Sequence, residues 1–169
     1  MSWSKLGVGL MHVLAKLPLP VLRGLGRVVG NVLYVVAAPR RKVALRNLEL
    51  CFPEKTDAER KALAKESIVV FCQTFLDRSW LWFGSEALVR SRVKLTGAVH
   101  ELDGDTPTIV FAPHFYSMDA GGLALPLNTE REFTSIFATN PDPVLDAWFM
   151  AGRQRFGKVR MLNRADGVK

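Results

Sequence analysis

Cysteine and histidine are scarce in this 169-residue chain, and the scarcity narrows the chemistry it can carry. Cys51 and Cys72 form neither a C-x-x-C motif nor any spacing typical of a metal site. His12, His100 and His114 are too scattered in the sequence to support a zinc site. We therefore expect two free thiols in a reducing compartment, with no metal and no cofactor.

Motifs for serine hydrolysis and nucleotide binding are missing as well. No G-x-S-x-G sequence is present, and Gly24, Gly26 and Gly30 do not follow the dinucleotide-binding spacing. Residues 152–158 match G-x-x-x-x-G-K, but Val159 follows where a phosphate-binding loop needs Ser or Thr. A helix is also expected before this stretch, where such a loop needs a strand. We interpret the match as chance.

Long uncharged runs are absent, and none reaches the roughly 18 residues expected of a bilayer-spanning helix. Residues 6–38 are rich in Leu, Val and Gly, but Lys16, Arg23 and Arg27 interrupt them. The Pro18-Leu19-Pro20 sequence divides the stretch. The pattern predicts two short amphipathic helices, at about residues 4–17 and 21–37.

The charges of the second helix favour a position at a membrane surface. Arg23 and Arg27 are four residues apart, so they share one face opposite the Leu and Val residues. Gly26 and Gly30 form a small-xxx-small pair, which permits close helix approach. The alternative is that both helices pack on the protein's own core.

Basic residues outnumber acidic ones by 23 to 16, which gives a net charge of +7 and a pI near 9.8. The charges flank apolar segments and form no stripe with exposed aromatics, so we expect no nucleic-acid partner. Basic residues beside a membrane segment gain about 1 kcal/mol each against anionic lipid and mark the cytoplasmic side. Four such residues follow the apolar stretch: Arg40, Arg41, Lys42 and Arg46. We expect residues 1–46 to be membrane-associated and not to be a cleaved signal peptide.

The remainder, residues 47–169, is predicted to be an α/β domain. Thr56-Asp57-Ala58-Glu59 is a capping box that opens a helix reaching about Trp82. Alternating strands and helices favour a largely parallel sheet with flanking helices. The expected strands are 93–95, 108–112, 133–138 and 160–162, and the expected helices are a short one ending before Pro126 and one at 141–156. Because the chain stops just after the fourth strand, we expect it to be an N-terminal fragment.

A histidine and a carboxylate follow the second expected strand, five residues apart. His114 comes directly after the apolar residues 108–112, and Asp119 lies five positions later. Residues at i and i+5 do not share a helix face, so the two can meet only if His114 lies on the strand end. Histidine suits proton transfer near neutral pH, and ligands bind at the carboxyl ends of strands in open α/β sheets. The alternative is a structural histidine.

The chain resembles the lipid A biosynthesis acyltransferases of Gram-negative bacteria, the lauroyl and myristoyl transferase family. The H-x4-D/E box is shared with glycerolipid acyltransferases generally, whereas the Asn-Leu…Cys-Phe-Pro-Glu segment makes the resemblance specific. The resemblance rests on the N-terminal segment with its Leu-Pro break, Arg46-Asn47-Leu48, Cys51-Phe52-Pro53-Glu54, Ala112-Pro113-His114-Phe115 with Asp119, Asn140-Pro141, Gly152-Arg153 and Asn163-Arg164. One departure is Tyr116-Ser117-Met118, which stands where many members carry Gly-Asn-Trp.

The resemblance implies acyl transfer from acyl-acyl carrier protein to a hydroxyl of a Kdo-bearing lipid A precursor, at the cytoplasmic face of the cell inner membrane. His114 would act as general base and Asp119 would orient it. Arg164 would bind the oxyanion or a lipid phosphate, and Arg153, with Arg155 and Lys158, would contact the acidic carrier protein or simply form an exposed helix face. Two alternatives stay open: an acyltransferase for another amphiphile, such as a lysophospholipid or a glycolipid, and a non-catalytic membrane-surface module.

Overall fold

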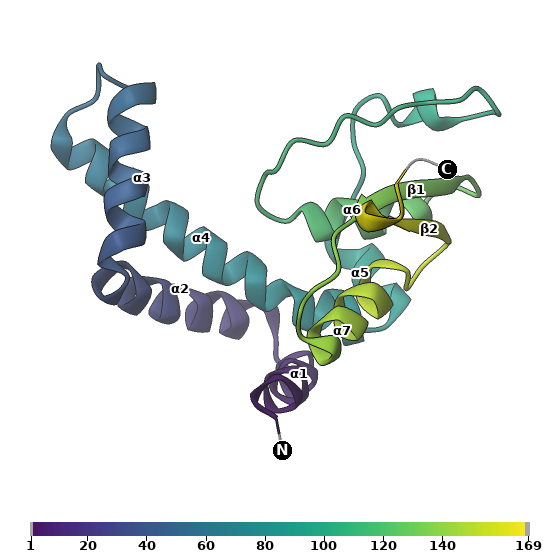
Figure 1. Cartoon of the computed structure of the whole chain (residues 1–169), viewed down its shortest axis with the longest axis horizontal. Helices are drawn as coiled ribbons and strands as arrows, with labels where there is room; N and C mark the ends of the chain where they lie inside the picture. The colour runs from purple at the N-terminus through teal and green to yellow at the C-terminus, as the bar shows by residue number, and fades with distance from the viewer. Residues whose placement is uncertain (1, 168–169) are drawn as a thin grey trace. The chain divides into compact units, whose positions relative to one another are not determined.

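The computed structural model describes residues 2–167 and shows a mostly helical chain with a small parallel sheet (Figure 1). It divides into two compact units, Leu17–Asp77 and Met1–Lys16 with Arg78–Lys169. The long helix α4 (Asp57–Phe83) contributes to both units. The expected boundary between a membrane-associated part (residues 1–46) and a catalytic part (residues 47–169) falls inside helix α3 (Ala38–Cys51). This functional division stays a prediction.

The unit Leu17–Asp77 is built from α2 (Leu19–Val36), α3 and most of α4. Glycines let α2 approach α4 closely: a Cβ on Gly26 would lie 2.7 Å from Cγ of Gln73, and one on Gly30 would lie 2.6 Å from Cα of Val69. Among the described helices, α2 is the one long and apolar enough to cross a bilayer, judged by length and composition alone. The expected helix at residues 21–37 is therefore confirmed.

The capping box that starts α4 is also confirmed. The Thr56 N–H donates to Oε2 of Glu59 over 2.7 Å, and the Glu59 N–H donates back to Oγ1 of Thr56 over 3.3 Å. These bonds satisfy donors that a helix N-terminus would otherwise leave unpaired. They also hold the pKa of Glu59 below its usual value, chiefly through the backbone N–H of Thr56.

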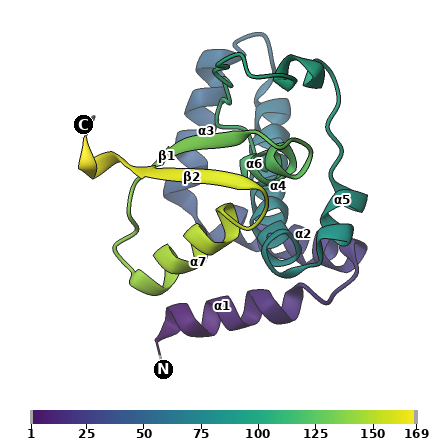
Figure 2. The ribbon, with the colours of Figure 1, turned by 90° about the vertical axis from the view of Figure 1, so that its right-hand side faces the viewer.

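The unit Met1–Lys16 with Arg78–Lys169 contains two parallel strands, which Figure 2 shows side by side above α7. Glu132 pairs with Lys158 at one end and Phe137 pairs with Asn163 at the other. The core includes Trp80, Leu81 and Leu123, each at most 4 % exposed. Its elements are α1 (Trp3–Leu14), the end of α4, α5 (Glu86–Arg92), η1 (Val99–Leu102), α6 (Met118–Leu127), β1 (Glu132–Phe137), α7 (Pro143–Arg153), β2 (Lys158–Asn163) and η2 (Arg164–Asp166).

The sheet is smaller than the sequence predicts. The strands at 133–138 and 160–162 are confirmed as β1 and β2, but the segments 93–95 and 108–112 form no strand. Residues 108–112 were expected to be buried, yet Ile109 is 97 % exposed and Phe111 is 88 % exposed. A β-branched run becomes a strand only where a neighbouring strand pairs with it, and the described chain supplies no such neighbour here.

Helix α6 also departs from expectation, because it continues through Pro126 to Leu127. Pro126 stands in the last turn, where its missing N–H removes one hydrogen bond without interrupting a longer helix. The Asn128 N–H then closes the helix on the Leu125 carbonyl over 3.0 Å. Helix α7, expected at 141–156, is confirmed within a shorter range.

Candidate active site

Asp119 lies in the first turn of α6, where two arginines hold its carboxylate. Nε of Arg78, at the end of α4, is 2.7 Å from Oδ2, and Nε of Arg153, at the end of α7, is 3.5 Å from Oδ1. The Asp119 side chain is 14 % exposed and that of Arg78 is 22 % exposed, so solvent screens this pair less than a surface pair. The helix N-terminus adds a further favourable field for a negative charge.

An aromatic cluster supports the two guanidinium groups. The Arg78 guanidinium lies 5.6 Å from the ring centroid of Trp82 and 5.7 Å from that of Phe149, and the Arg153 guanidinium lies 5.4 Å from Phe149. These are cation–π distances. Gly152 makes the cluster possible, because a Cβ there would lie 2.3 Å from Cδ2 of Trp82. The carboxylate is thus fixed by three helices that meet on one aromatic surface.

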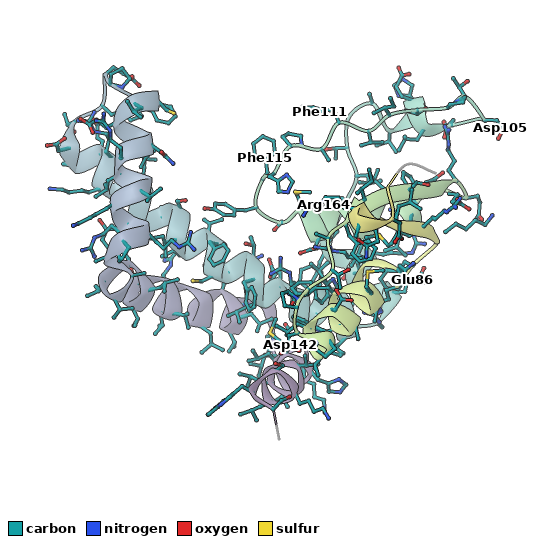
Figure 3. The ribbon with its side chains drawn as sticks, viewed as in Figure 1. Glu86, Asp105, Phe111, Phe115, Asp142 and Arg164 are labelled. Atoms are coloured by element: carbon teal, nitrogen blue, oxygen red, sulfur yellow. The ribbon has the colours of Figure 1, made fainter. Side chains whose placement is uncertain are left out.

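His114 lies in a different setting, on residues 103–117, which have no regular secondary structure. Its side chain is exposed, and within residues 2–167 it makes no hydrogen bond or ion pair with Asp119. Phe111 and Phe115 lie on the same segment in Figure 3 and are 88 % and 74 % exposed. The structure therefore brings Asp119 together with Arg153 but leaves His114 apart from it.

Arg164 is exposed in η2, immediately after β2. The Asn163 side chain fixes this turn by accepting the Ala165 N–H over 2.9 Å and donating to Oγ1 of Thr139 over 2.6 Å. Arg164 itself has no hydrogen bond or ion pair in the described part of the chain. It stands at the carboxyl end of the two-stranded sheet, the end where parallel sheets usually bind ligands.

The basic residues after α7 do not form one exposed face. Arg155 is turned inward, where its guanidinium donates to the Leu81 carbonyl over 3.0 Å and to the Gly84 carbonyl. Burial lowers the pKa of Arg155 below its ordinary value. Lys158 is exposed at the start of β2. Arg155 therefore serves the fold, since it closes the end of α4.

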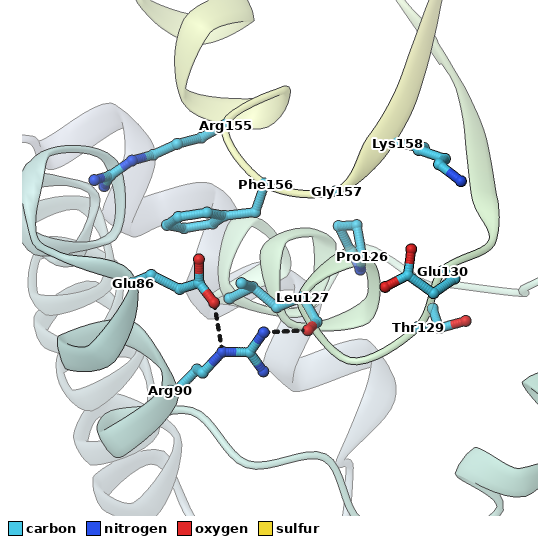
Figure 4. A pocket seen from close by; sticks show the side chains of 10 residues that line it. All are labelled: Glu86, Arg90, Pro126, Leu127, Thr129, Glu130, Arg155, Phe156, Gly157 and Lys158. Atoms are coloured by element: carbon cyan, nitrogen blue, oxygen red, sulfur yellow. Dashed lines mark hydrogen bonds and ion pairs between the residues drawn. The ribbon is translucent and has the colours of Figure 1, made fainter.

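A pocket of about 290 Å³ lies at the amino end of β2, between α5 and the end of α6 (Figure 4). The Arg90 side chain lines this pocket and joins α5 to α6, because its Nε is 2.7 Å from Oε1 of Glu86 and its Nη2 donates to the Leu127 carbonyl over 2.6 Å. Asp119 and Arg164 do not line it. Sequence reasoning missed both this pocket and Arg78, and no spacing in the sequence links Arg78 to Asp119.

Comparison with known proteins decides the family. The family model for bacterial lipid A biosynthesis acyltransferases matches residues 1–169. The chain belongs to this family. Curated relatives agree: it is 28% identical over 164 residues to a lipid A biosynthesis acyltransferase of Haemophilus influenzae, covering 95% of this chain and 52% of the relative. The resemblance expected from the sequence is confirmed.

Two further relatives come from Escherichia coli. The lipid A biosynthesis myristoyltransferase is 30% identical over 171 residues, covering 97% of this chain and 51% of the relative. The lipid A biosynthesis lauroyltransferase is 26% identical over 169 residues, covering 98% of this chain and 54% of the relative. The chain thus spans about half the length of the curated relatives it matches. No solved structure matches it significantly.

Proposed function

We propose that the protein is an O-acyltransferase of lipid A biosynthesis. It would move a fatty acyl chain from acyl-acyl carrier protein to a hydroxyl of a Kdo-bearing lipid A precursor. The family match over the whole chain carries this proposal. His114 and Asp119 lie within the matched residues, and their residue types suit a general base and the group that orients it. The relatives' names support lipid A biosynthesis as the process.

The proposed chemistry is direct transfer with general-base catalysis. His114 takes the proton of the acceptor hydroxyl while the hydroxyl oxygen attacks the thioester carbonyl carbon. The tetrahedral intermediate then collapses, the carbon–sulfur bond breaks, and the imidazolium returns its proton to the departing thiolate. No covalent acyl-enzyme is needed, in keeping with the missing nucleophile motif.

Asp119 would orient the imidazole and stabilise its charged form. A carboxylate offers about four acceptor positions, so Asp119 can keep Arg78 and still accept a hydrogen bond from His114. This requires residues 103–117 to bring His114 toward the first turn of α6. In this proposal, Arg78 and Arg153 hold Asp119 in place, and a movement of residues 103–117 brings His114 within hydrogen-bonding distance of it.

Arg164 and Arg153 are the proposed substrate contacts. Arg164 is exposed, so its guanidinium is available to an oxyanion or a lipid phosphate. Arg153 is 40 % exposed and bonds to Asp119 through Nε, so its terminal nitrogens remain available to the acidic carrier protein. The proposed place of reaction is the cytoplasmic face of the inner membrane, with residues 1–46 as the membrane-associated part and residues 47–169 as the catalytic part.

The test is an acyl-transfer assay of the complete gene product in detergent micelles. Acyl carrier protein donors of several chain lengths are combined with a Kdo-lipid A precursor, a lysophospholipid and a glycolipid, and the products are measured by mass spectrometry. We expect acylation of the lipid A precursor. If only the lysophospholipid or the glycolipid is acylated, that lipid replaces the lipid A precursor as the proposed acceptor. If no acceptor is acylated, a non-catalytic membrane module is favoured.

A further inference from the structure

Helix α2 has two contrasting faces within the unit Leu17–Asp77. One face packs on α4 through Leu22, Gly26 and Gly30, all of which are buried. The other is a continuous row of apolar side chains between 39 % and 68 % exposed, which we call the valine stripe: Val21, Leu25, Val28, Val29, Val32, Val35 and Val36. The i, i+4, i+7, i+11 spacing of its members places them on one side of the helix along its whole length. An exposed apolar patch of this kind marks an interaction surface.

The charges beside the stripe indicate the chemistry of its partner. The first 48 residues contain eight Lys or Arg and no Asp or Glu. Arg41 donates to the Tyr34 and Val35 carbonyls at the end of α2, which attaches the basic start of α3 to the end of the stripe. Arg40 and Lys42, on either side of it, are exposed. An apolar stripe with cations at one end, on a helix that itself carries no acidic residue, complements an anionic lipid surface.

The packing of α2 on α4 argues against a spanning orientation. Nη2 of Arg23 is 2.9 Å from Oδ2 of Asp77, whose side chain is 4 % exposed, and Nε2 of Gln73 donates to the Arg23 carbonyl over 3.0 Å. Toward its start, α4 carries Lys61, Lys65 and Glu66, all of them exposed. If α2 crossed a bilayer, this charged partner helix would have to enter the hydrocarbon with it, and such residues are costly there.

We propose that α2 does not cross the membrane but lies in the plane of an anionic bilayer surface, although its length and composition would allow it to span. The valine stripe faces the acyl chains, the glycine face stays on α4, and Arg40 and Lys42 contact lipid phosphates. This inference rests on the membrane location in the proposed function and specifies how the membrane is bound.

The first test measures binding of the whole chain to vesicles by flotation. Vesicles of phosphatidylethanolamine with phosphatidylglycerol are compared with vesicles of phosphatidylcholine alone. Val28→Asp should lower the partition coefficient at least about tenfold, because it removes an apolar side chain that the bilayer would bury and adds a charge that anionic lipid repels. Leu50→Asp is the matched control, since Leu50 is 63 % exposed and Val28 is 62 % exposed. Equal losses in both variants, or no binding by the unaltered chain, would overturn the inference.

The second test decides between lying and spanning. A cysteine is introduced next to one end of α2 or the other, as Leu17→Cys or Ala37→Cys. The exposed Cys51 is replaced by serine in both variants, and the buried Cys72 is kept. Cys51→Ser without a new cysteine gives the background labelling. The variants are labelled in sealed inside-out inner-membrane vesicles with a membrane-impermeant maleimide. An in-plane helix exposes both ends to the same side, so both should label as fully as they do after detergent is added. Protection of one end until detergent is added means that α2 spans the membrane and the inference is wrong.

Activity in micelles separates this inference from the proposed function. Acyl transfer in detergent together with a protected helix end would overturn the in-plane orientation and leave the enzyme assignment intact. Labelling of both helix ends without acyl transfer would support the in-plane orientation and overturn the proposed enzyme activity. If sedimentation shows that Val28→Asp dissociates a dimer while vesicle binding is unchanged, the stripe joins two copies of the chain and the inference fails.

Discussion

The first turn of α6 and the segment that leads into it, residues 103–117, place the two predicted catalytic side chains in opposite environments. Asp119 has two arginines and an aromatic cluster around it, supplied by α4 and α7. His114 is exposed on a segment whose apolar side chains also face solvent. Arg131 anchors the start of this segment by donating to the Leu102 and Thr106 carbonyls.

The comparison shows that different interactions position Asp119 and His114, the two residues of the candidate catalytic pair. The carboxylate is placed by contacts between residues far apart in sequence, which a packed core enforces. The histidine is placed by a segment without regular secondary structure, whose apolar side chains are exposed. In the proposed mechanism, the site is complete only when this segment brings His114 to Asp119.

The largest expected effect concerns the histidine. His114→Ala should lower acyl transfer by about 10² to 10⁴, since that is the usual contribution of a general base. The thermal midpoint should not change, because the side chain is exposed and makes no contact that folding needs. Activity and melting are measured on the same preparation. Turnover close to that of the unaltered protein would remove His114 from the mechanism.

Core truncation tests whether the two regions really differ in packing. Leu123→Ala in α6 should cost about 2–5 kcal/mol of unfolding free energy, since Leu123 is 1 % exposed. Phe111→Ala removes a larger side chain but should change stability by no more than about 0.5 kcal/mol, because Phe111 is 88 % exposed. Urea unfolding gives both values. A large loss for Phe111→Ala would mean that the segment is packed in solution.

The arginine beside the carboxylate gives a smaller effect on stability. Arg78→Ala should cost about 1–3 kcal/mol, because it removes a charged hydrogen bond and two cation–π contacts at a partly buried carboxylate. Arg46→Ala is the control, because the Arg46–Glu49 pair is exposed on both sides and such pairs contribute little. Equal stabilities for the two variants would show that Asp119 is not held as described.

The smallest effect is a pH dependence at the start of α7, the helix that carries Arg153. The Ser4 hydroxyl, followed by the Leu145 and Val144 N–H groups, holds the pKa of Asp142 below its ordinary value of 3.8. A lowered folded pKa stabilises the protein above that ordinary value, and the gain is lost as the pH falls through the folded pKa.

Asp142→Asn keeps a good helix cap and removes the charge. At pH 7 the unaltered protein should melt slightly higher, and the gap should close as the pH falls below about 4. Thermal melts of both proteins between pH 2.5 and 7, spaced about half a unit apart around the ordinary aspartate value, follow this. Parallel curves over the whole range would contradict the assigned cause.

Local signals predicted the helices well, and long-range packing explains what they missed. Proline at positions 18 and 20 and the capping box at Thr56 act on their own neighbours, so α1, α2 and α4 could be located from the sequence. A strand depends on a partner that may be far along the chain, and residues 108–112 have none in the described structure.

The candidate site shows the same division. The H-x4-D spacing identified His114 and Asp119, because the two residues stand close together in the sequence. Arg78 could not be found in this way, since it lies 41 residues before Asp119, and its role arises where α4 meets α6. The proposed roles of Arg153 and Arg164 depend on substrates and stay predictions.

One backbone angle gives Ser117 more influence over the site than its side chain suggests. Its φ of 66° makes it the one non-glycine residue in the left-handed region among residues 2–167, and its hydroxyl makes no cap hydrogen bond. Ser117 lies three positions after His114, a stretch that spans at most about 10 Å when fully extended. A change in the backbone angles of Ser117 can therefore displace His114 by up to a distance of that order. In the proposed mechanism, substitutions at position 117 would change how far His114 reaches toward Asp119 without altering either proposed catalytic side chain.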